Sequence, residues 1–216
     1  MKTTIPDIEQ KTYEEITAFQ QKKLQELLAY ASTYSKFYQS HFKKNNIAIP
    51  YIKTVEDLQQ IPVTSKDDLY NHNPDFICVD TEKIIDYVTT SGTLGDPLTF
   101  VLTDKDLERL AYNEHISLAC AGGTKKDIYQ LMTTIDRRFM AGMAYFLGIK
   151  QMGAGVVRVG NGMPEFQWDT IKRLQPTIAI AVPSFLIKLI EFAEQNNIDY
   201  KNCTIKKIVC IVEPIR

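Results

Sequence analysis

Apolar residues in the first 80 positions recur at intervals of three and four, the spacing that places them on one face of a helix. The first such stripe comprises Tyr13, Ile16, Phe19, Leu24, Leu27 and Leu28. A second stripe, within residues 35–45, carries Phe37, Tyr38 and Phe42. We interpret both stripes as core positions rather than as a cofactor-binding set, and residues 1–83 are therefore predicted to form a helical segment.

Two short motifs in this region predict helix starts. Thr54-Val-Glu-Asp57 and Thr64-Ser-Lys-Asp67 each place a hydroxyl three residues before a carboxylate. The hydroxyl can accept a hydrogen bond from a free amide of the first helical turn. The carboxylate is favoured there because it lies near the positive end of the helix dipole.

After residue 84 the pattern changes, and short runs of β-forming residues alternate with helical stretches. The predicted strands are 84–90, 98–102, 127–133, 155–159, 177–182 and 207–212. The predicted helices run from Thr103 to Cys120, Arg138 to Lys150, Pro164 to Leu174 and Pro183 to Glu194. Gly122-Gly123 and Gly153 are placed to end the first two of these helices.

This alternation, with continuous apolar strands such as IAIAV and KIVCIV, predicts an α/β fold with a doubly wound, mainly parallel sheet. We expect the helical segment 1–83 to pack on an α/β subdomain of residues 84–216. Ligands of such sheets bind beyond the carboxyl ends of the strands. The loops after Val182, Val212 and Thr90 are therefore expected to lie at the functional edge.

Composition excludes several classes of function. The 216 residues carry a net charge of −1, which argues against the clustered basic surface that nucleic-acid binding requires. No apolar run reaches the roughly 18 residues of a membrane span, and the polar, acidic start is no signal peptide. The four cysteines lack CxxC spacing and the three histidines are isolated, so we expect reduced thiols, no metal site and a cytoplasmic location.

The stretch YVTTSGTLGDP, residues 87–97, combines two glycines with four serine and threonine side chains. Gly92 and Gly95 can adopt left-handed conformations and allow the backbone to approach a ligand closely. Successive backbone N–H groups in such a turn form an anion-binding concavity. The stretch is not a Walker A motif, and its residues alone leave two interpretations open: a polar hairpin turn or a loop that holds phosphate.

Four segments carry a resemblance to one family. TSGTLGDP, residues 90–97, resembles the TSGTTGKP signature of the adenylate-forming superfamily. PVTSKDDLYNHNPDF (62–76), AVPSFLIKLIEFAEQ (181–195) and IVEPIR (211–216) are similar to the TTKxDLRxxYPF, TPSYxxxLAE and GAEPW elements of its phenylacetate–CoA ligase branch. Because their order and approximate spacing also agree, the resemblance covers the whole chain, as the N-terminal part of the family's large domain.

The resemblance implies a reaction and its binding residues. A carboxylic acid, phenylacetate or another aryl acid, would attack MgATP to form an acyl-adenylate, and CoA would then displace AMP. The β- and γ-phosphates would be held by Thr90, Ser91, Gly92, Thr93 and Gly95. Glu213 and Pro214 would lie beside the base, and Phe139, Met140 and Ala141 would line the acyl pocket. Helix core is an equally good interpretation of Phe139, Met140 and Phe146. No catalytic residue is assigned, and a homodimer stays open as an assembly.

The chain departs from the family pattern at several positions. Asp96 stands where the family usually has lysine, and a carboxylate about 4 Å from the triphosphate would cost about 4 kcal/mol, so we expect it to face solvent. Leu94 removes a hydroxyl, and Ile211-Val212 replaces Gly-Ala. Family members are also about twice as long, and we therefore expect no carboxylate-dependent ATP–pyrophosphate exchange from these 216 residues alone. Two alternatives are a truncated, non-catalytic nucleotide- or acyl-binding module and an adenylating enzyme that uses an acceptor other than CoA.

Overall fold

The computed structural model describes residues 6–90 and 97–213. The chain divides into two compact units, Met1–Thr103 and Asp104–Arg216, and each is described by itself. The division predicted between residues 83 and 84 stays a prediction.

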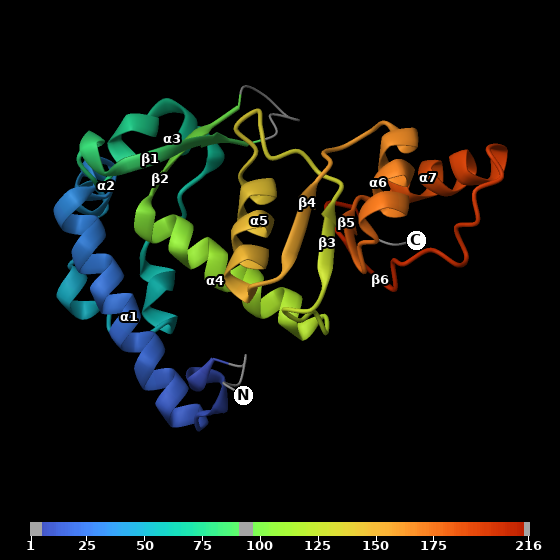
Figure 1. Cartoon of the computed structure of the whole chain (residues 1–216). Coiled ribbons are helices and arrows are strands. Elements are labelled where there is room, and N and C mark those ends of the chain that lie inside the picture. The colour runs from blue at the N-terminus through green and yellow to red at the C-terminus, as the bar shows by residue number, and fades with distance from the viewer. Residues whose placement is uncertain (1–5, 91–96, 214–216) are drawn as a thin grey trace. The chain divides into compact units, whose positions relative to one another are not determined.

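The first unit is mainly helical (Figure 1). Its α-helices are α1(Tyr13–Tyr34), α2(Lys36–Lys44) and α3(Lys66–Asn71). Its 3-10 helices are η1(Asp7–Gln10), η2(Ile49–Tyr51), η3(Glu56–Gln60), η4(Asn73–Phe76) and η5(Thr81–Lys83). Strands β1(Ile84–Thr89) and β2(Thr99–Thr103) follow and pair antiparallel.

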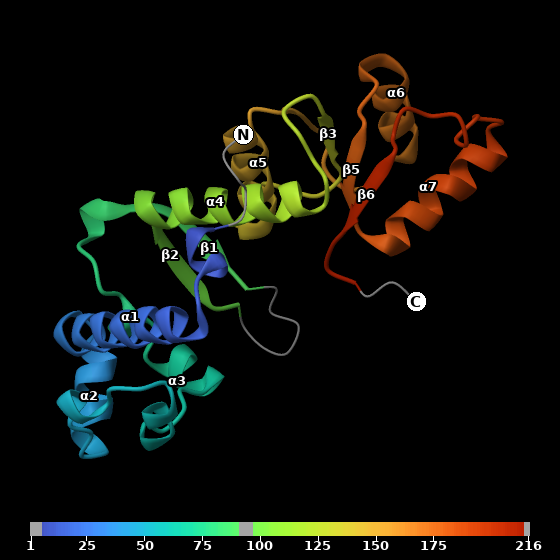
Figure 2. The ribbon, with the colours of Figure 1, turned by 90° about the horizontal axis from the view of Figure 1, so that it is seen from below.

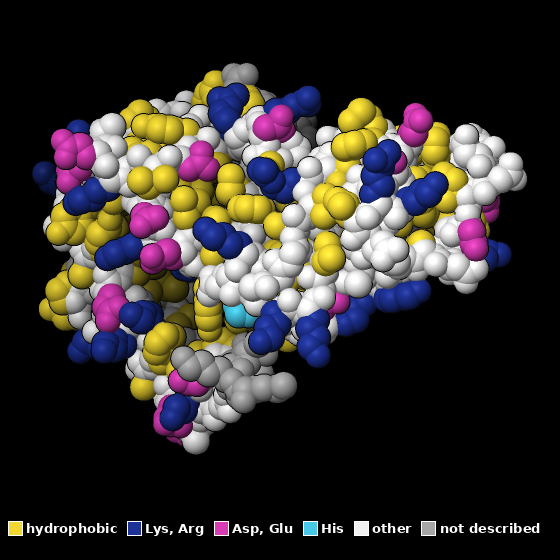
Figure 3. Space-filling model, in the orientation of Figure 1, with side chains coloured by type: hydrophobic (Ala, Val, Ile, Leu, Met, Phe, Trp, Pro, Cys, Tyr) yellow, Lys and Arg dark blue, Asp and Glu magenta, His cyan; other side chains and the backbone are white. Residues whose placement is uncertain are grey.

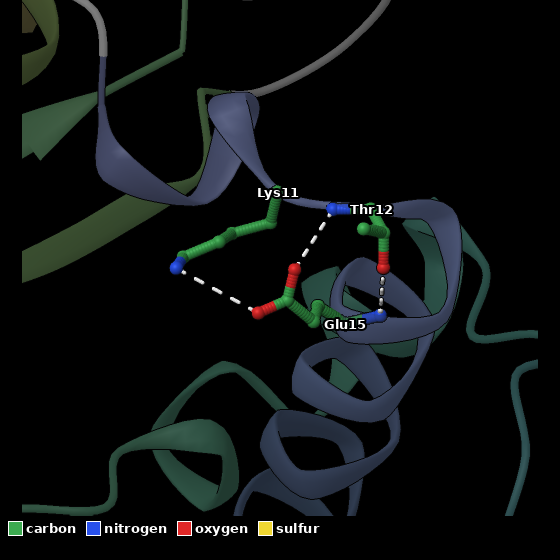
Figure 4. Close-up of polar contacts among 3 residues, drawn as sticks. All are labelled: Lys11, Thr12 and Glu15. Atoms are coloured by element: carbon green, nitrogen blue, oxygen red, sulfur yellow. Dashed lines mark hydrogen bonds and ion pairs between the residues drawn. The ribbon is translucent and has the colours of Figure 1, made fainter.

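Helix α1 begins at a capping box (Figure 4). The Glu15 amide donates to Thr12 Oγ1 at 3.3 Å, and the Thr12 amide donates to Glu15 Oε2 at 3.0 Å. Lys11 Nζ lies 3.6 Å from Glu15 Oε1. The hydrogen bond from the Thr12 amide holds the pKa of Glu15 below its ordinary value. Two of the otherwise free backbone donors at this helix end are therefore satisfied locally.

The two predicted helix starts have different outcomes. At the first, the Asp57 amide donates to Thr54 Oγ1 at 3.3 Å and the Thr54 amide donates to Asp57 Oδ2 at 2.9 Å, as predicted. The element that follows is the 3-10 helix η3 rather than an α-helix. At the second, the cap lies one residue later than predicted, because Ser65 and Asp68 form the capping box of α3.

The first apolar stripe is only partly core. Leu24 and Leu28 are buried with Phe42 and Ile52 in one cluster. Tyr13, Phe19 and Leu27 are 80%, 42% and 62% exposed, so the prediction that they are core residues is wrong. In the second stripe, the prediction of core positions is confirmed for Phe37 and Phe42, which are both buried. The part of α1 that is buried is narrower than its apolar stripe.

The second unit contains a four-stranded parallel sheet in the order β4-β3-β5-β6. Its strands are β3(Ile128–Leu131), β4(Gly155–Arg158), β5(Ile178–Ala181) and β6(Lys207–Cys210). Its helices are α4(Asp104–Cys120), α5(Met140–Met152), α6(Pro164–Leu174) and α7(Pro183–Gln195). This confirms the predicted α/β fold with a helical segment before a doubly wound, parallel sheet.

Helices cover both faces of this sheet (Figures 1 and 2). Successive residues of a strand point to opposite faces of the sheet. In β5 the larger isoleucine side chains therefore lie on one face and the smaller alanine side chains on the other. Ile178 and Ile180 pack with Leu118 of α4 and Ile149 of α5. On the other face, Ala179 and Ala181 pack with larger side chains, which are Trp168 and Ile171 of α6 and Leu189 of α7. The alanines leave room for the indole, whose Nε1 donates to the Leu189 carbonyl at 2.9 Å.

Surface charge is mixed. On the face drawn in Figure 3, basic and acidic side chains are interspersed among apolar and neutral ones. The formal net charge of −1 agrees with this mixing. None of the helices in residues 6–90 and 97–213 is both long and apolar enough to cross a membrane.

One half-buried carboxyl on α4 gives a pH-dependent prediction. Burial raises the pKa of Glu114 above its ordinary value of 4.5. The protonated carboxyl is therefore preferred in the folded state, and its contribution to stability is lost as the pH rises from 4.5 through the folded-state pKa. We expect Glu114→Gln to raise the midpoint of thermal unfolding at pH 7 and to have little effect below pH 4.5.

The matched control is Glu108→Gln, an exposed carboxyl on the same helix. Thermal unfolding followed by circular dichroism between pH 4 and pH 8 would check the difference. A Glu114→Gln gain that is equal at both ends of this range would contradict burial as its cause.

Candidate functional site

The carboxyl edge of the parallel sheet is the candidate site. Four segments leave the strands at this edge: 132–139 after β3, 159–163 after β4, Val182 after β5 and 211–213 after β6. The chain passes from β3 to β4 on one side and then crosses to β5 on the other. Open α/β sheets bind ligands at such a reversal of strand order.

Two of these segments are joined by a direct contact. Glu213 Oε2 accepts from the Ser184 amide at 3.0 Å, and Glu213 Oε1 accepts from Ser184 Oγ at 2.9 Å. Ser184 is the second residue of α7, where the amides have no partner within the helix. The contact joins the segments that follow β5 and β6, which are neighbouring strands of the sheet.

The backbone after β6 turns sharply at Val212. The predicted strand 207–212 ends at Cys210, and Ile211 is buried in the core. Val212 has a φ of 70°, and the Glu213 amide donates to the Ile211 carbonyl at 2.8 Å across it. This is a γ-turn with a left-handed central residue, which is rare and, for a β-branched side chain, costs about 1–3 kcal/mol. The turn directs Glu213 toward α7.

A buried pair of amides supports the segment after β4. Gln167 Nε2 donates to the carbonyls of Gly160 at 2.9 Å and Gly162 at 3.2 Å. Gln167 Oε1 accepts from Gln130 Nε2 at 2.7 Å, and both glutamines are fully buried. Because the two carbonyls require donors, they fix the orientation of both side-chain amides. Gly160, Gly162 and Met163 have φ values of 78°, 80° and 48°, so the segment is left-handed over most of its length.

The segment after β3 contains the residues predicted for the acyl pocket. Helix α5 begins at Met140, two residues later than predicted, because Arg137 and Arg138 have φ values of 57° and 61°. Phe139 is the N-cap residue, and Met140 is 38% exposed at the start of the helix. The residues proposed for the pocket, Phe139, Met140 and Ala141, therefore lie at the carboxyl edge, and their role stays a prediction.

The predicted phosphate loop is only partly within the described residues. Ser91, Gly92, Thr93 and Gly95 lie outside them, as does Pro214. The Thr90 amide donates to the Leu98 carbonyl at 3.0 Å, and Thr90 Oγ1 accepts from the Leu98 amide at 3.1 Å. The strands before and after the stretch are antiparallel neighbours, the arrangement of a hairpin. Such a connection and a phosphate-binding role do not exclude each other.

A metal ion cannot be assigned to residues that the structure describes. Within residues 6–90 and 97–213, no group of three or more His, Cys, Asp or Glu side chains could hold one.

Comparison with known proteins links the chain to acid–CoA ligases. Phenylacetate-coenzyme A ligase of Escherichia coli (strain K12) is 28% identical over 214 residues, which is 98% of this chain and 49% of the relative. The Thermus thermophilus enzyme of the same name is 28% identical over 210 residues, 97% of this chain and 47% of the relative. The chain spans about half the length of the curated relatives it matches.

Solved structures show the same fold. A crystal structure of 2-hydroxyisobutyryl-CoA ligase in complex with 2-HIB-AMP and CoA has a TM-score of 0.85 and 22% identity, over 94% of this chain and 44% of that chain. A long-chain-fatty-acid-CoA ligase from Archaeoglobus fulgidus has a TM-score of 0.50 and 19% identity, over 85% of this chain and 40% of that chain. No protein-family model matches the chain. The relatives confirm the resemblance predicted from the four motif segments.

Proposed function

Since this chain is a relative of the phenylacetate–CoA ligases, we propose that it contributes to ATP-dependent activation of a carboxylic acid, followed by acyl transfer to CoA. The names of the curated relatives favour phenylacetate or another aryl acid as the substrate. The relationship covers nearly the whole chain but about half of each relative, so the complete reaction is part of the proposal.

One structural observation supports the proposal most directly. The segments 181–195 and 211–216, which resemble family motifs, meet at the carboxyl edge through Ser184 and Glu213. That edge is where ligands of open parallel sheets bind. Two motifs that are distant in sequence are therefore neighbours at the expected place for a nucleotide and an acyl group.

The roles that we propose for individual residues follow from the resemblance to the family. The triphosphate would be held by Thr90, Ser91, Gly92, Thr93 and Gly95. Their hydroxyl and backbone donors would stabilise the negative charge that develops on the leaving pyrophosphate when the acid attacks the α-phosphate. Glu213 and Pro214 would border the base, and the start of α5 would border the acyl group.

ATP binding to this chain tests the phosphate loop. We expect saturating MgATP, at about 100 times its dissociation constant, to stabilise the wild-type chain by about 2.7 kcal/mol. Ser91→Ala/Thr93→Ala should lose most of this gain because two hydroxyl donors are removed. Ser117→Ala is the control, since that hydroxyl bonds the Asn113 carbonyl of its own helix at 2.8 Å. Equal ATP-induced shifts in the wild type and the loop variant would remove the loop from the phosphate role.

Isotope exchange between ATP and pyrophosphate separates catalysis from binding. We expect ATP binding without carboxylate-dependent exchange from these 216 residues, which would indicate a nucleotide- or acyl-binding module when the chain acts alone. Exchange that requires an aryl acid would instead establish adenylation by this chain.

A further inference from the structure

The turn at Val212 is held between two fixed points. On one side Ile211 is buried, and its amide donates to the Ala181 carbonyl at 3.1 Å, which extends the pairing of β6 with β5. On the other side Glu213 is bound to Ser184 at the start of α7, beside which the chain leaves β6 (Figure 2). A strained backbone conformation persists only where its surroundings over-determine it. These two contacts supply that constraint.

Both oxygens of the Glu213 carboxylate are hydrogen-bonded within the chain. Each of its oxygens accepts one hydrogen bond from Ser184, one from the backbone amide and one from the hydroxyl. The amide belongs to the first turn of a helix, where a negative charge is favoured by the dipole. This geometry suits a group that organises the edge of the sheet better than one that binds the nucleotide itself.

We infer that Ser184 and Glu213 are positioning residues for the proposed nucleotide site. Their contact holds the γ-turn at Val212 and so sets the path of the chain beyond β6 relative to α7. In this inference Glu213 acts on a bound nucleotide through this backbone geometry and not by direct contact. The inference rests on the proposed function for its ligand and on the described contacts for its mechanism.

Two measurements on the 216-residue chain test the inference. The first is the dissociation constant of MgATP, measured by calorimetry. We expect Ser184→Ala, which removes one of the two hydrogen bonds, to weaken binding about fivefold, and Glu213→Ala, which removes both, to weaken it at least as much. The double variant should have the same affinity for MgATP as the single variant that binds it less tightly, because both substitutions break the same contact. Ser184→Thr, which keeps the hydroxyl, should restore wild-type affinity.

The second measurement does not depend on ATP. Amide hydrogen exchange at Glu213, followed by nuclear magnetic resonance, reports on the bond to the Ile211 carbonyl. We expect exchange to be about tenfold faster in Ser184→Ala than in the wild type and unchanged in Ser184→Thr.

The outcomes separate this inference from the proposed function. Unchanged exchange at Glu213 in Ser184→Ala would overturn the positioning role. Weaker ATP binding in Glu213→Ala but not in Ser184→Ala would also overturn it, because Glu213 would then contact the nucleotide directly. If the wild type bound no ATP, the proposed function would fail, and the exchange measurement would still decide whether the contact holds the turn.

Discussion

Replacing Gln167 with leucine is expected to lower the free energy of unfolding of the second unit by about 3 kcal/mol. The substitution removes the donor to the Gly160 and Gly162 carbonyls and the acceptor for Gln130 Nε2. Gln130 Nε2 keeps its 3.2 Å bond to the Gln167 carbonyl, so part of the network survives. Urea unfolding followed by fluorescence of Trp168 would measure the effect, because this buried tryptophan is the only one in the sequence.

A double-mutant cycle tests whether the two glutamines act as one unit. Gln130 Oε1 is buried and has no hydrogen-bond partner among the described residues. Gln130→Leu therefore removes this unsatisfied oxygen together with the Nε2 group that donates to Gln167. We expect Gln130→Leu to cost less than Gln167→Leu and the double variant to cost less than their sum. Gln195→Ala, an exposed position at the end of α7, is the control. Additive single effects would contradict the coupling.

Gly142→Ala is expected to destabilise the second unit by about 2–3 kcal/mol. Helix propensity alone would favour alanine by about 1 kcal/mol, so the expected sign is the reverse of the local preference. A methyl group at Gly142 would overlap the Thr134 carbonyl oxygen and lie 3.0 Å from Ile135 Cα, and both belong to the backbone of the segment after β3. Backbone atoms cannot move aside as a flexible side chain can.

The same urea titration would measure this effect. Gln151→Ala, exposed on the same helix, should change the free energy of unfolding by less than about 0.5 kcal/mol. Stabilisation by Gly142→Ala would show that the segment 132–139 does not pack against α5 at this point. Because that segment precedes Phe139 and Met140, the same variant should also disturb the proposed acyl pocket.

The elements that the sequence predicts well are those with local causes. Pro164 and Pro183 stand in the first turns of α6 and α7, and Gly153 ends α5 with a φ of 78°. The alternating IAIA of β5 lies fully buried between two helical layers, as a continuous apolar strand predicts. Propensity, helix capping and periodicity act within a few residues, so they can be read from the chain alone.

The features of the candidate site that sequence analysis missed depend on tertiary contacts. Ser184 and Glu213 are 29 positions apart, and only the register of β5 and β6 brings them together. No local signal marks the left-handed backbone of Arg137, Arg138 or Val212. Gln130 did carry a signal, because a lone amide within a buried strand requires a polar partner. That signal predicts that Gln130 has a polar partner, but it does not identify Gln167 as that partner.

The connections of the parallel sheet also set an order of events during synthesis of the chain on the ribosome. Strands β1 and β2 can pair as soon as both have emerged, since they are neighbours in sequence. Strand β3 pairs with β5, which follows it only after α5, β4 and α6 have been made. At roughly 5–20 residues per second, one edge of β3 stays unpaired for several seconds. Until then Tyr129 and Leu131, which are fully buried in the folded unit, lack their packing partners on β5.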